Sequence, residues 1–172
     1  MRHAWMVMVA TLMGASQASA ASGKAVIQAT TPNSAVSGEA TLTETEKGLR
    51  VNVQVRNVPP GTHGLHIHEH GDCANTGNAA GGHYNPVGTP HGFLPKDGMT
   101  KAHPGDLGNI EVGKDGNGRL ELTLKNVRLQ EGNYTVANRA IVLHEKTDDF
   151  GQPTGNAGGR IGCGVIVDAD AR

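Results

Sequence analysis

Apolar and polar residues alternate along several stretches of the chain, and this pattern predicts β-strands. In LRVNVQVRNV, residues 49–58, every second residue from Leu49 to Val55 is apolar, as expected of a strand with one buried face. RLELTLK, residues 119–125, repeats the pattern after a KDGNG turn. Further strands are expected at 25–29, 36–46, 62–69, 108–113, 140–145 and 162–167. Eight short strands separated by turn signals predict an all-β fold, an antiparallel barrel or sandwich.

Two long loops interrupt this pattern. Residues 70–107 are rich in Gly, Pro and Asn and contain no expected strand. A compact domain rarely holds a structureless loop longer than about 12–15 residues unless the loop is functional or disordered. Disorder is the simpler explanation, but the loop carries groups that can tie it down, namely Cys73, His83, His91, His103 and Asp106. A second Gly-rich loop, 146–161, precedes Cys163, and a disulfide between the two cysteines would bring both loops together.

The first twenty residues, MRHAWMVMVATLMGASQASA, have the layout of a secretory signal peptide. A basic start at Arg2 is followed by an apolar stretch and by the small residues Ala18, Ser19 and Ala20, which predict cleavage after Ala20. The apolar stretch is too short for a membrane span, and a buried N-terminal helix is the alternative. We therefore expect export to the periplasm or the exterior, with residues 21–172 forming a single domain that does not enter a membrane.

Charge and cysteine content narrow the function classes. The net charge is −1 and the pI is about 6.7, so nothing indicates binding to nucleic acid or to an anionic membrane. Cys73 and Cys163 are the only cysteines, and in an exported chain such a pair is first interpreted as a disulfide. Two free buried thiols are the alternative, which export disfavours.

The distribution of histidines predicts a metal site. In GLHIHEHGDC, residues 64–73, alternation places His66, His68 and His70 on one face of a strand. Three more histidines lie in the long loop that follows, and His144 ends the apolar strand AIVLHE. Scattered histidines are usually just solvated, and a single histidine in a strand is more often a hydrogen-bonded core residue. The combination nevertheless favours metal binding.

The ligand types indicate which metals would bind. Zinc suits a set of three imidazoles and one carboxylate, which the long loop offers in His83, His91, His103 and Asp106. Copper suits a set of imidazoles, which the strands offer in His66, His68 and His144. The sequence therefore predicts one ligand set for zinc and another for copper.

Four motifs resemble signatures of the copper–zinc superoxide dismutase family: GLHIHEHGDC, AGGHYNP, HPGDLGNI and HEKTDDFGQPTGNAGGRIGCGVI. The resemblance extends from about residue 25 to 167, and the signal peptide and the short spacing between His68 and Cys73 resemble a secreted or periplasmic bacterial member. It implies an eight-stranded antiparallel Greek-key β-barrel or sandwich, immunoglobulin-like, with two long functional loops. It also implies an oxidoreductase with one copper and one zinc ion per subunit, which converts superoxide into oxygen and hydrogen peroxide by cycling Cu(II) and Cu(I).

Carried over residue by residue, the resemblance implies two metal sites that share one histidine. The copper ligands would be His66, His68, His83 and His144, and the zinc ligands His83, His91, His103 and Asp106. His83 would bridge both metals as an imidazolate. Cys73 and Cys163 would form the family's disulfide and anchor the long loop to the last strand. His70 matches no ligand of the family and is expected to face solvent or a second subunit.

Further residues would support the site or line its channel. Asp148 matches a carboxylate that hydrogen-bonds one copper ligand and one zinc ligand, and His63 matches a residue that supports the site without binding metal. Arg160 matches the guanidinium that binds superoxide beside copper. Thr154 matches the residue that narrows the channel opposite it, and Lys146 matches a channel cation. On the residues alone, each channel residue could also be plain surface.

Two rival functions follow from the same ligands. A zinc hydrolase would need an open metal position and a general base, but Asp106 is better used as a ligand, and Glu69 and Glu145 are expected to point away. A copper carrier or buffer is the stronger rival. Arg160 and Thr154 argue against it, because a buffer needs no substrate channel. The oligomeric state stays open between a monomer and a homodimer with an interface unlike the eukaryotic one, and we favour the homodimer.

Overall fold

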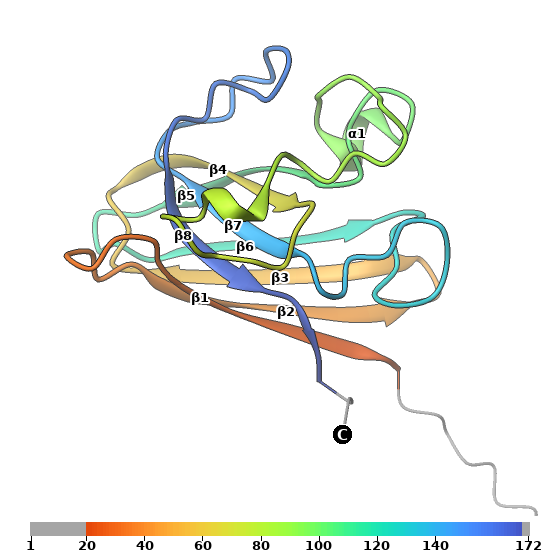
Figure 1. The fold of residues 1–172 in the computed structure, drawn as a ribbon, viewed down its shortest axis with the longest axis horizontal. Helices are drawn as coiled ribbons and strands as arrows, with labels where there is room; N and C mark the ends of the chain where they lie inside the picture. Colours follow the sequence, from red (N-terminus) through yellow and green to blue (C-terminus); the bar gives the residue numbers. More distant parts are fainter. Residues whose placement is uncertain (1–19, 170–172) are drawn as a thin grey trace, which may run out of the picture.

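The chain folds into an antiparallel β-barrel in a computed structural model that describes residues 20–169 (Figure 1). The strands are β1 (Ser22–Ala29), β2 (Ser37–Thr45), β3 (Gly48–Arg56), β4 (Gly61–His68), β5 (Asp106–Val112), β6 (Gly118–Leu124), β7 (Ala140–His144), β8 (Arg160–Val165) and β9 (Val167–Asp168). Neighbouring strands follow the order β2-β3-β6-β5-β4-β7-β8-β1, and the pairing of β1 with β2 closes the barrel. The steps from β3 to β4 and from β6 to β7 skip neighbours, so the connectivity is of the Greek-key type.

The alternating pattern of β3 is the inside–outside pattern of the barrel. Leu49, Val51, Val53 and Val55 are all buried in the core. Val51 pairs with Leu42 of β2 on one side and with β6 on the other. Apolar side chains from successive strands therefore meet inside the barrel, and the predicted fold class and the eight predicted strands are confirmed.

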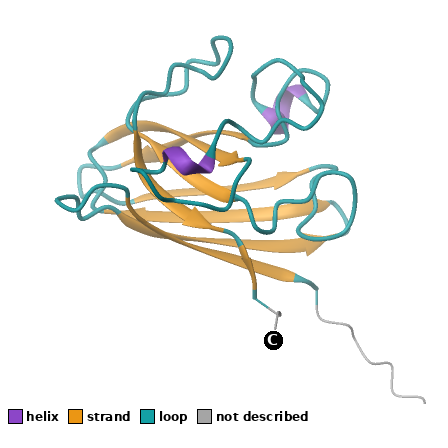
Figure 2. Cartoon of the chain, viewed as in Figure 1, coloured by secondary structure: helices purple, strands orange, loops and turns teal. Residues whose placement is uncertain are grey.

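The structure differs from the sequence expectation in short elements. β9 has only two residues, too few for a recognisable pattern, and it pairs with β1 beyond the closed barrel. The 70–107 loop is not free of regular structure, because it contains η1 (Asn78–Ala80) and α1 (Leu94–Asp97), and β5 begins at Asp106. Figure 2 shows these two helical turns within otherwise irregular chain. Such short helices leave no apolar repeat in the sequence.

Both long loops are held against the barrel. The backbone N–H of Ile67 donates to the carbonyl of Gly105, and that of Tyr84 donates to the carbonyl of Ile67, each at 2.8 Å. A Cβ atom at Gly105 would lie 2.2 Å from the Ile67 oxygen, so only glycine permits this approach. At the other end of the loop, Cys73 forms a disulfide with Cys163 of β8 across a Cα–Cα distance of 5.7 Å. The predicted disulfide is present.

The N-terminal prediction lies almost entirely outside the described residues, because the expected signal peptide falls on residues 1–19 and Ala20. Within the described part of the chain, no helix is long and apolar enough to cross a membrane.

Candidate metal centre

Strands β4 and β7 bring three histidines together. Along β4, Leu65 and Ile67 belong to the core, so the alternate residues His66 and His68 lie on the opposite face, where loops cover them. β7 pairs with β4, and its last residue, His144, places its ring 4.9 Å from that of His66 and 5.4 Å from that of His68, measured between centroids. All three histidines are buried.

The long loop adds His83 to this group. A β-bridge joins His83 to His68, and the ring of His83 lies 4.0 Å from that of His66. One nitrogen from each of His66, His68, His83 and His144 lies within 4.8 Å of the others. The structure thus brings together the four residues expected to bind copper.

A second group forms around the carboxylate of Asp106. Its Oδ1 lies 2.9 Å from Nδ1 of His83 and 3.1 Å from Nδ1 of His103, while its Oδ2 lies 2.9 Å from Nδ1 of His91. The backbone N–H groups of Gly92 and His103 donate to Oδ2 at 2.9 Å and hold the carboxylate in place. These are the four residues expected to bind zinc, and His83 belongs to both groups.

The carboxylate of Asp148 is hydrogen-bonded to one histidine of each group. Its Oδ2 lies 2.8 Å from Nε2 of His66, and its Oδ1 lies 2.9 Å from Nε2 of His91. The side-chain amide of Asn109 on β5 fixes Asp148 in turn, accepting from its backbone N–H at 2.8 Å and donating to its carbonyl at 2.9 Å. One carboxylate therefore orients one member of each group.

The free ring nitrogens fit bound metal ions. In the described part of the chain, Nδ1 of His66 and Nδ1 of His91 are buried without a hydrogen-bond partner, an arrangement that is costly unless another partner satisfies the atom. Nδ1 of His91 is close to Asp106 without hydrogen-bond alignment, as two ligands of one ion would be. Nδ1 of His68 donates to the carbonyl of Gly81 at 2.9 Å, which leaves its Nε2 lone pair for a metal. Metal-binding histidines typically have their outer nitrogen held in this way.

Three histidines of the copper group, His68, His83 and His144, are neutral near neutral pH. Burial lowers the pKa of His68 to about 2, with His83 and Arg160 contributing, and it lowers the pKa of His144 to about 3. Burial also lowers the pKa of His83 to about 4, although the hydrogen bond to Asp106 opposes the shift. A metal ion needs unprotonated imidazole, so these side chains can bind copper without first losing a proton.

In the zinc group, nearby carboxylates raise a histidine pKa instead of letting burial lower it. Burial would lower the pKa of His91, but the close carboxylates of Asp106 and Asp148, the second of them hydrogen-bonded to Nε2, outweigh it and raise that pKa to about 9. Burial would raise the pKa of Asp106, yet contacts with His103, His83 and His91 hold it well below its usual value. The zinc group thus carries a proton on His91 that zinc must displace.

Arg160 lies at the start of β8, beside the copper group. Its Nη1 donates to the carbonyl of Gly77 and its Nη2 to that of Gly81, both at 2.6 Å. Its positive charge helps to lower the pKa values of His68 and His144. Burial lowers the pKa of Arg160 itself, but a guanidinium remains charged. The structure therefore places a fixed cation next to the candidate copper ligands.

The remaining predicted residues take varied positions. His63 is buried, with Nδ1 2.9 Å from the carbonyl oxygen of His144 and Nε2 2.8 Å from that of Pro59. Lys146 is exposed, with its aliphatic part beside Gly158. Thr154 is exposed on a turn, and the hydrogen bonds of Arg160 in the described part of the chain go to other residues. Its place in a channel rests on the sequence resemblance alone.

Three residues expected to stay outside the metal groups do so. His70 is exposed, and its Nε2 lies 3.5 Å from Oε1 of Glu69. The carboxylates of Glu69 and Glu145 accept backbone N–H groups, from Gly82 at 3.1 Å and from Gly159 at 3.3 Å. Neither glutamate belongs to a described metal group, so no general base of a zinc hydrolase is found among them.

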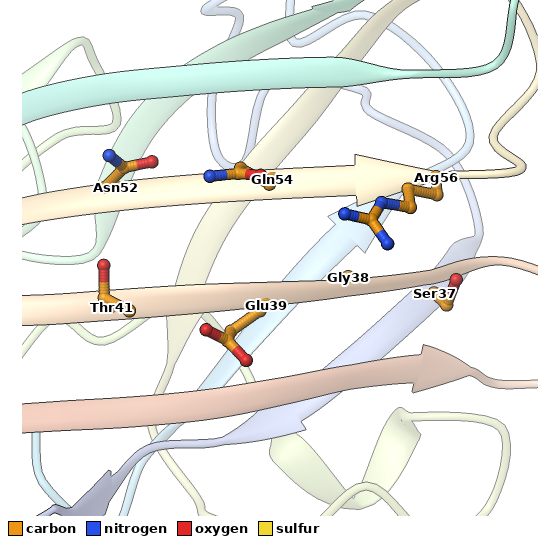
Figure 3. A pocket seen from close by; sticks show the side chains of 7 residues that line it. All are labelled: Ser37, Gly38, Glu39, Thr41, Asn52, Gln54 and Arg56. Carbon is orange, nitrogen blue, oxygen red and sulfur yellow. The ribbon is translucent and has the colours of Figure 1, made fainter.

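A pocket on the outside of the barrel is separate from this site. Figure 3 shows polar side chains of β2 and β3 lining it, among them Glu39, Asn52, Gln54 and Arg56. Glu39 is already paired with Lys24 of β1 at 2.6 Å. No candidate ligand lines this pocket, so the buried histidine cluster is the stronger candidate for the functional site.

Sequence reasoning missed the groups that position the side chains. Arg160 is held by the carbonyls of Gly77 and Gly81, which carry no side chain that a motif could reveal. Asn109 was included in the HPGDLGNI motif but received no role, and Gln152, which hydrogen-bonds to the backbone of His91, was only part of a longer motif. For Gly81, Asn109 and Gln152 the only signal was their position within the family motifs, and Gly77 lies outside the motifs.

The comparisons with known proteins agree with this geometry. A family model described as copper/zinc superoxide dismutase (SODC) matches residues 36–166, so the chain belongs to the copper/zinc superoxide dismutase family. An extracellular Cu-Zn superoxide dismutase of Brugia pahangi is 34% identical over 145 residues, which are 78% of this chain and 71% of that protein. The corresponding protein of Caenorhabditis elegans is 42% identical over 131 residues, 72% of this chain and 58% of that protein. A crystal structure of the clock protein EA4 has a TM-score of 0.76 and 35% identity, covering 90% of this chain and 99% of the other.

These findings confirm several predictions. The family, the class of enzyme, an oxidoreductase of the superoxide dismutase type, and the cofactors copper and zinc are as predicted. The extracellular relatives and the disulfide bear out the expected export. Both relatives come from nematodes, so the bacterial type remains a prediction.

Proposed function

We propose that this chain removes superoxide at a copper–zinc centre built from the two histidine groups. Copper would be held by Nδ1 of His66 and by Nε2 of His68, His83 and His144, and zinc by Nδ1 of His83, His91 and His103 together with the carboxylate of Asp106. The observation that carries the proposal is the membership of His83 in both buried four-ligand groups. The family membership supports it.

His83 would act as the proton carrier of the reaction. Bound copper supplies the one-electron redox chemistry, which zinc cannot supply. The Nδ1 atom of His83 lies beside Asp106, and Nε2 would be the nitrogen that it offers to copper. Whenever copper does not occupy Nε2, that atom could hold a proton and give it to the reduced substrate. Asp106, which is itself fixed by two backbone N–H groups, keeps the ring oriented throughout.

Arg160 would bind the superoxide anion. The carbonyls of Gly77 and Gly81 hold two of its N–H groups, and the remaining donors of the guanidinium fork are available to an anion. Because the protein as a whole has a net charge of −1, attraction of the substrate depends on such local positive charge. Lys146, exposed at the loop surface, would add to it, and Thr154 would narrow the channel.

The turnover assay separates this function from its rival, copper storage. Protein loaded with copper and zinc is added to a superoxide-generating system, and inhibition of cytochrome c reduction is measured. The expected result is inhibition at catalytic amounts of protein, with Arg160→Ala much less effective at equal copper content. A carrier would remove no more superoxide than one reaction per copper ion, and Arg160→Ala would equal the wild type.

The mature protein would begin after Ala20, form a single domain that stays out of the membrane, and assemble as a homodimer. The exposed side chains of Val26 and Val167, 55% and 51% accessible, support an interface, since they line a shallow pocket together with the disulfide. Light scattering of the exported protein tests the oligomer, with Val26→Lys expected to convert dimer to monomer. A wild-type monomer at all concentrations would contradict it.

A further inference from the structure

Two side-chain amides link the loop between β7 and β8 to its surroundings, one to the barrel and one to the backbone of His91. The amide of Asn109 on β5 pairs with both backbone groups of Asp148. Four residues further along the same loop, the amide of Gln152 pairs with both backbone groups of His91: Oε1 accepts the N–H at 3.0 Å, and Nε2 donates to the carbonyl at 2.9 Å. The loop between β7 and β8, blue at the top of Figure 1, is thus bound to the barrel through Asn109 and to the 70–107 loop through Gln152.

This segment contacts His91 in three ways. Asp148 binds its Nε2 atom, Gln152 binds its backbone, and the ring of Phe150 lies nearly parallel to its ring, 6.3 Å away with an angle of 21°. Phe93, two residues after His91 in the 70–107 loop, packs against the same phenyl ring with 6.0 Å between the ring centroids. Backbone and ring of His91 are therefore both restrained by residues 148–152.

The segment is stiff enough to act as a support. The N–H of Asp149 donates to the carbonyl of Gly155 at 2.9 Å, and the N–H of Gly155 donates to that of Gly151 at 2.7 Å. Gly155 has a φ of 75°, and a Cβ atom there would lie 1.8 Å from Oδ1 of Asp148, so the turn closes directly onto the carboxylate that orients His91.

We propose that Gln152 is a positioning residue that sets how slowly zinc leaves the protein. The inference rests on the proposed role of His91 as a zinc ligand. Zinc can leave only after ligands swing away, and His91 cannot move far while its N–H and its carbonyl are both bound to Gln152. Without the amide, the backbone of His91 keeps only the hydrogen bond of the next N–H, that of Gly92, to Asp106, and its ring contacts. If the two hydrogen bonds between Gln152 and His91 have ordinary strength, their removal should make zinc release about tenfold faster.

The experiment follows zinc transfer from the copper–zinc-loaded protein to an excess of a chromogenic chelator. Gln152→Ala is expected to release zinc about tenfold faster than the wild type, and Gln152→Asn equally fast, because its amide is one methylene too short to span both groups. Gln152→Glu should lie between them, since a carboxylate still accepts from the N–H but cannot donate to the carbonyl. This graded rescue would not arise from a general loosening of the loop.

The matched control is Asn156→Gly, which removes the hydrogen bonds to Asp149 but leaves Gln152 intact and suits the positive φ of 52° at this position. It should release zinc at the wild-type rate. A second readout is the visible spectrum of cobalt placed in the zinc site, which should change with Gln152→Ala and not with Asn156→Gly.

Two outcomes overturn the inference in distinguishable ways. If His91→Ala binds zinc as tightly as the wild type, His91 is not a ligand and the proposed zinc site fails together with the inference. If His91→Ala binds zinc more weakly but Gln152→Ala releases it at the wild-type rate, the site stands and the positioning role of Gln152 is wrong.

Discussion

His68 and Arg160 donate hydrogen bonds to the same oxygen atom, the carbonyl of Gly81. Nδ1 of His68 lies 2.9 Å and Nη2 of Arg160 lies 2.6 Å from it. One backbone group therefore fixes the tautomer of a candidate copper ligand and the position of the guanidinium that would bind the substrate. The distance between metal and anion site depends on the loop that carries Gly81, and so on the disulfide at Cys73 that holds this loop.

Arg160 variants should separate substrate attraction from metal binding. Arg160→Ala should lower activity strongly while both metals stay bound, because no ligand is changed. Arg160→Lys should retain part of the activity, since the charge survives without the fork of donors. Arg160→Glu should be the least active, and raising the salt concentration should slow the wild type more than Arg160→Ala. Steady-state activity assays at low and high salt, with the copper content measured in each sample, check this prediction. If Arg160→Glu had the same activity as the wild type at low salt, Arg160 would not be the residue that binds the substrate.

Loss of the disulfide should affect stability and activity together. Cys73→Ser should lower the free energy of unfolding by about 2–5 kcal/mol, the usual cost for a small secreted domain. Activity should fall as well, because the loop bearing Gly77 and Gly81 then holds Arg160 less firmly. Denaturant unfolding and activity of the metal-loaded variant measure both effects. Mass spectrometry that found two free thiols in the exported wild type would refute the premise.

Removal of His83 should disturb both metals. His83 is the member common to the copper group and the zinc group, so His83→Ala leaves each with three protein ligands. We expect the copper absorption spectrum to change and zinc affinity to fall in the same variant, whereas His144→Ala should alter copper alone. Copper spectra and zinc titrations of the two variants make the comparison. A normal copper spectrum in His83→Ala with zinc bound would show that the histidine is not shared.

Zinc binding to the metal-free protein should release a proton near neutral pH. The pKa of His91 is raised to about 9, so below that pH the imidazole is protonated and zinc must displace the proton. Zinc affinity should therefore rise with pH, about tenfold per unit between about pH 7 and pH 9. The copper-group residues His68 and His144, with pKa values of about 2 and 3, add no such dependence in this range.

Calorimetry in buffers of different ionisation enthalpy counts the protons released. Asp148→Asn provides the comparison, because it removes one of the two carboxylates that raise the pKa of His91 and should reduce the number of protons released. Zinc affinity that is independent of pH in the wild type would show that His91 is already neutral.

The sequence predicted the barrel well because the evidence for it is local. Alternation from Leu49 to Val55 marks a buried face directly, and β1 and β6 alternate in the same way. β9 was missed because two residues cannot show a period, and α1 because one turn, begun by Leu94 before Pro95, shows no apolar repeat.

For the site, the sequence indicated side chains with chemistry but not the groups that hold them. The ligand histidines follow from their type and spacing, whereas the carbonyl of Gly81 looks like any other backbone group until the loop is folded over β4. The same is true of Gln152, whose amide is important only because His91, 61 residues away in sequence, lies beside it. Such long-range contacts are set by tertiary structure and leave no local pattern.

The most direct test of the account is the decay of a pulse of superoxide, recorded after pulse radiolysis, in the presence of the protein loaded with copper and zinc. The account predicts a decay that is first order in superoxide, with a rate proportional to the concentration of loaded protein and sustained over many turnovers per copper. Protein loaded with zinc alone should leave the spontaneous decay unchanged. If the fully loaded protein removed no more superoxide than one reaction per copper ion, the site would bind metal without catalysing dismutation, and the account would be contradicted.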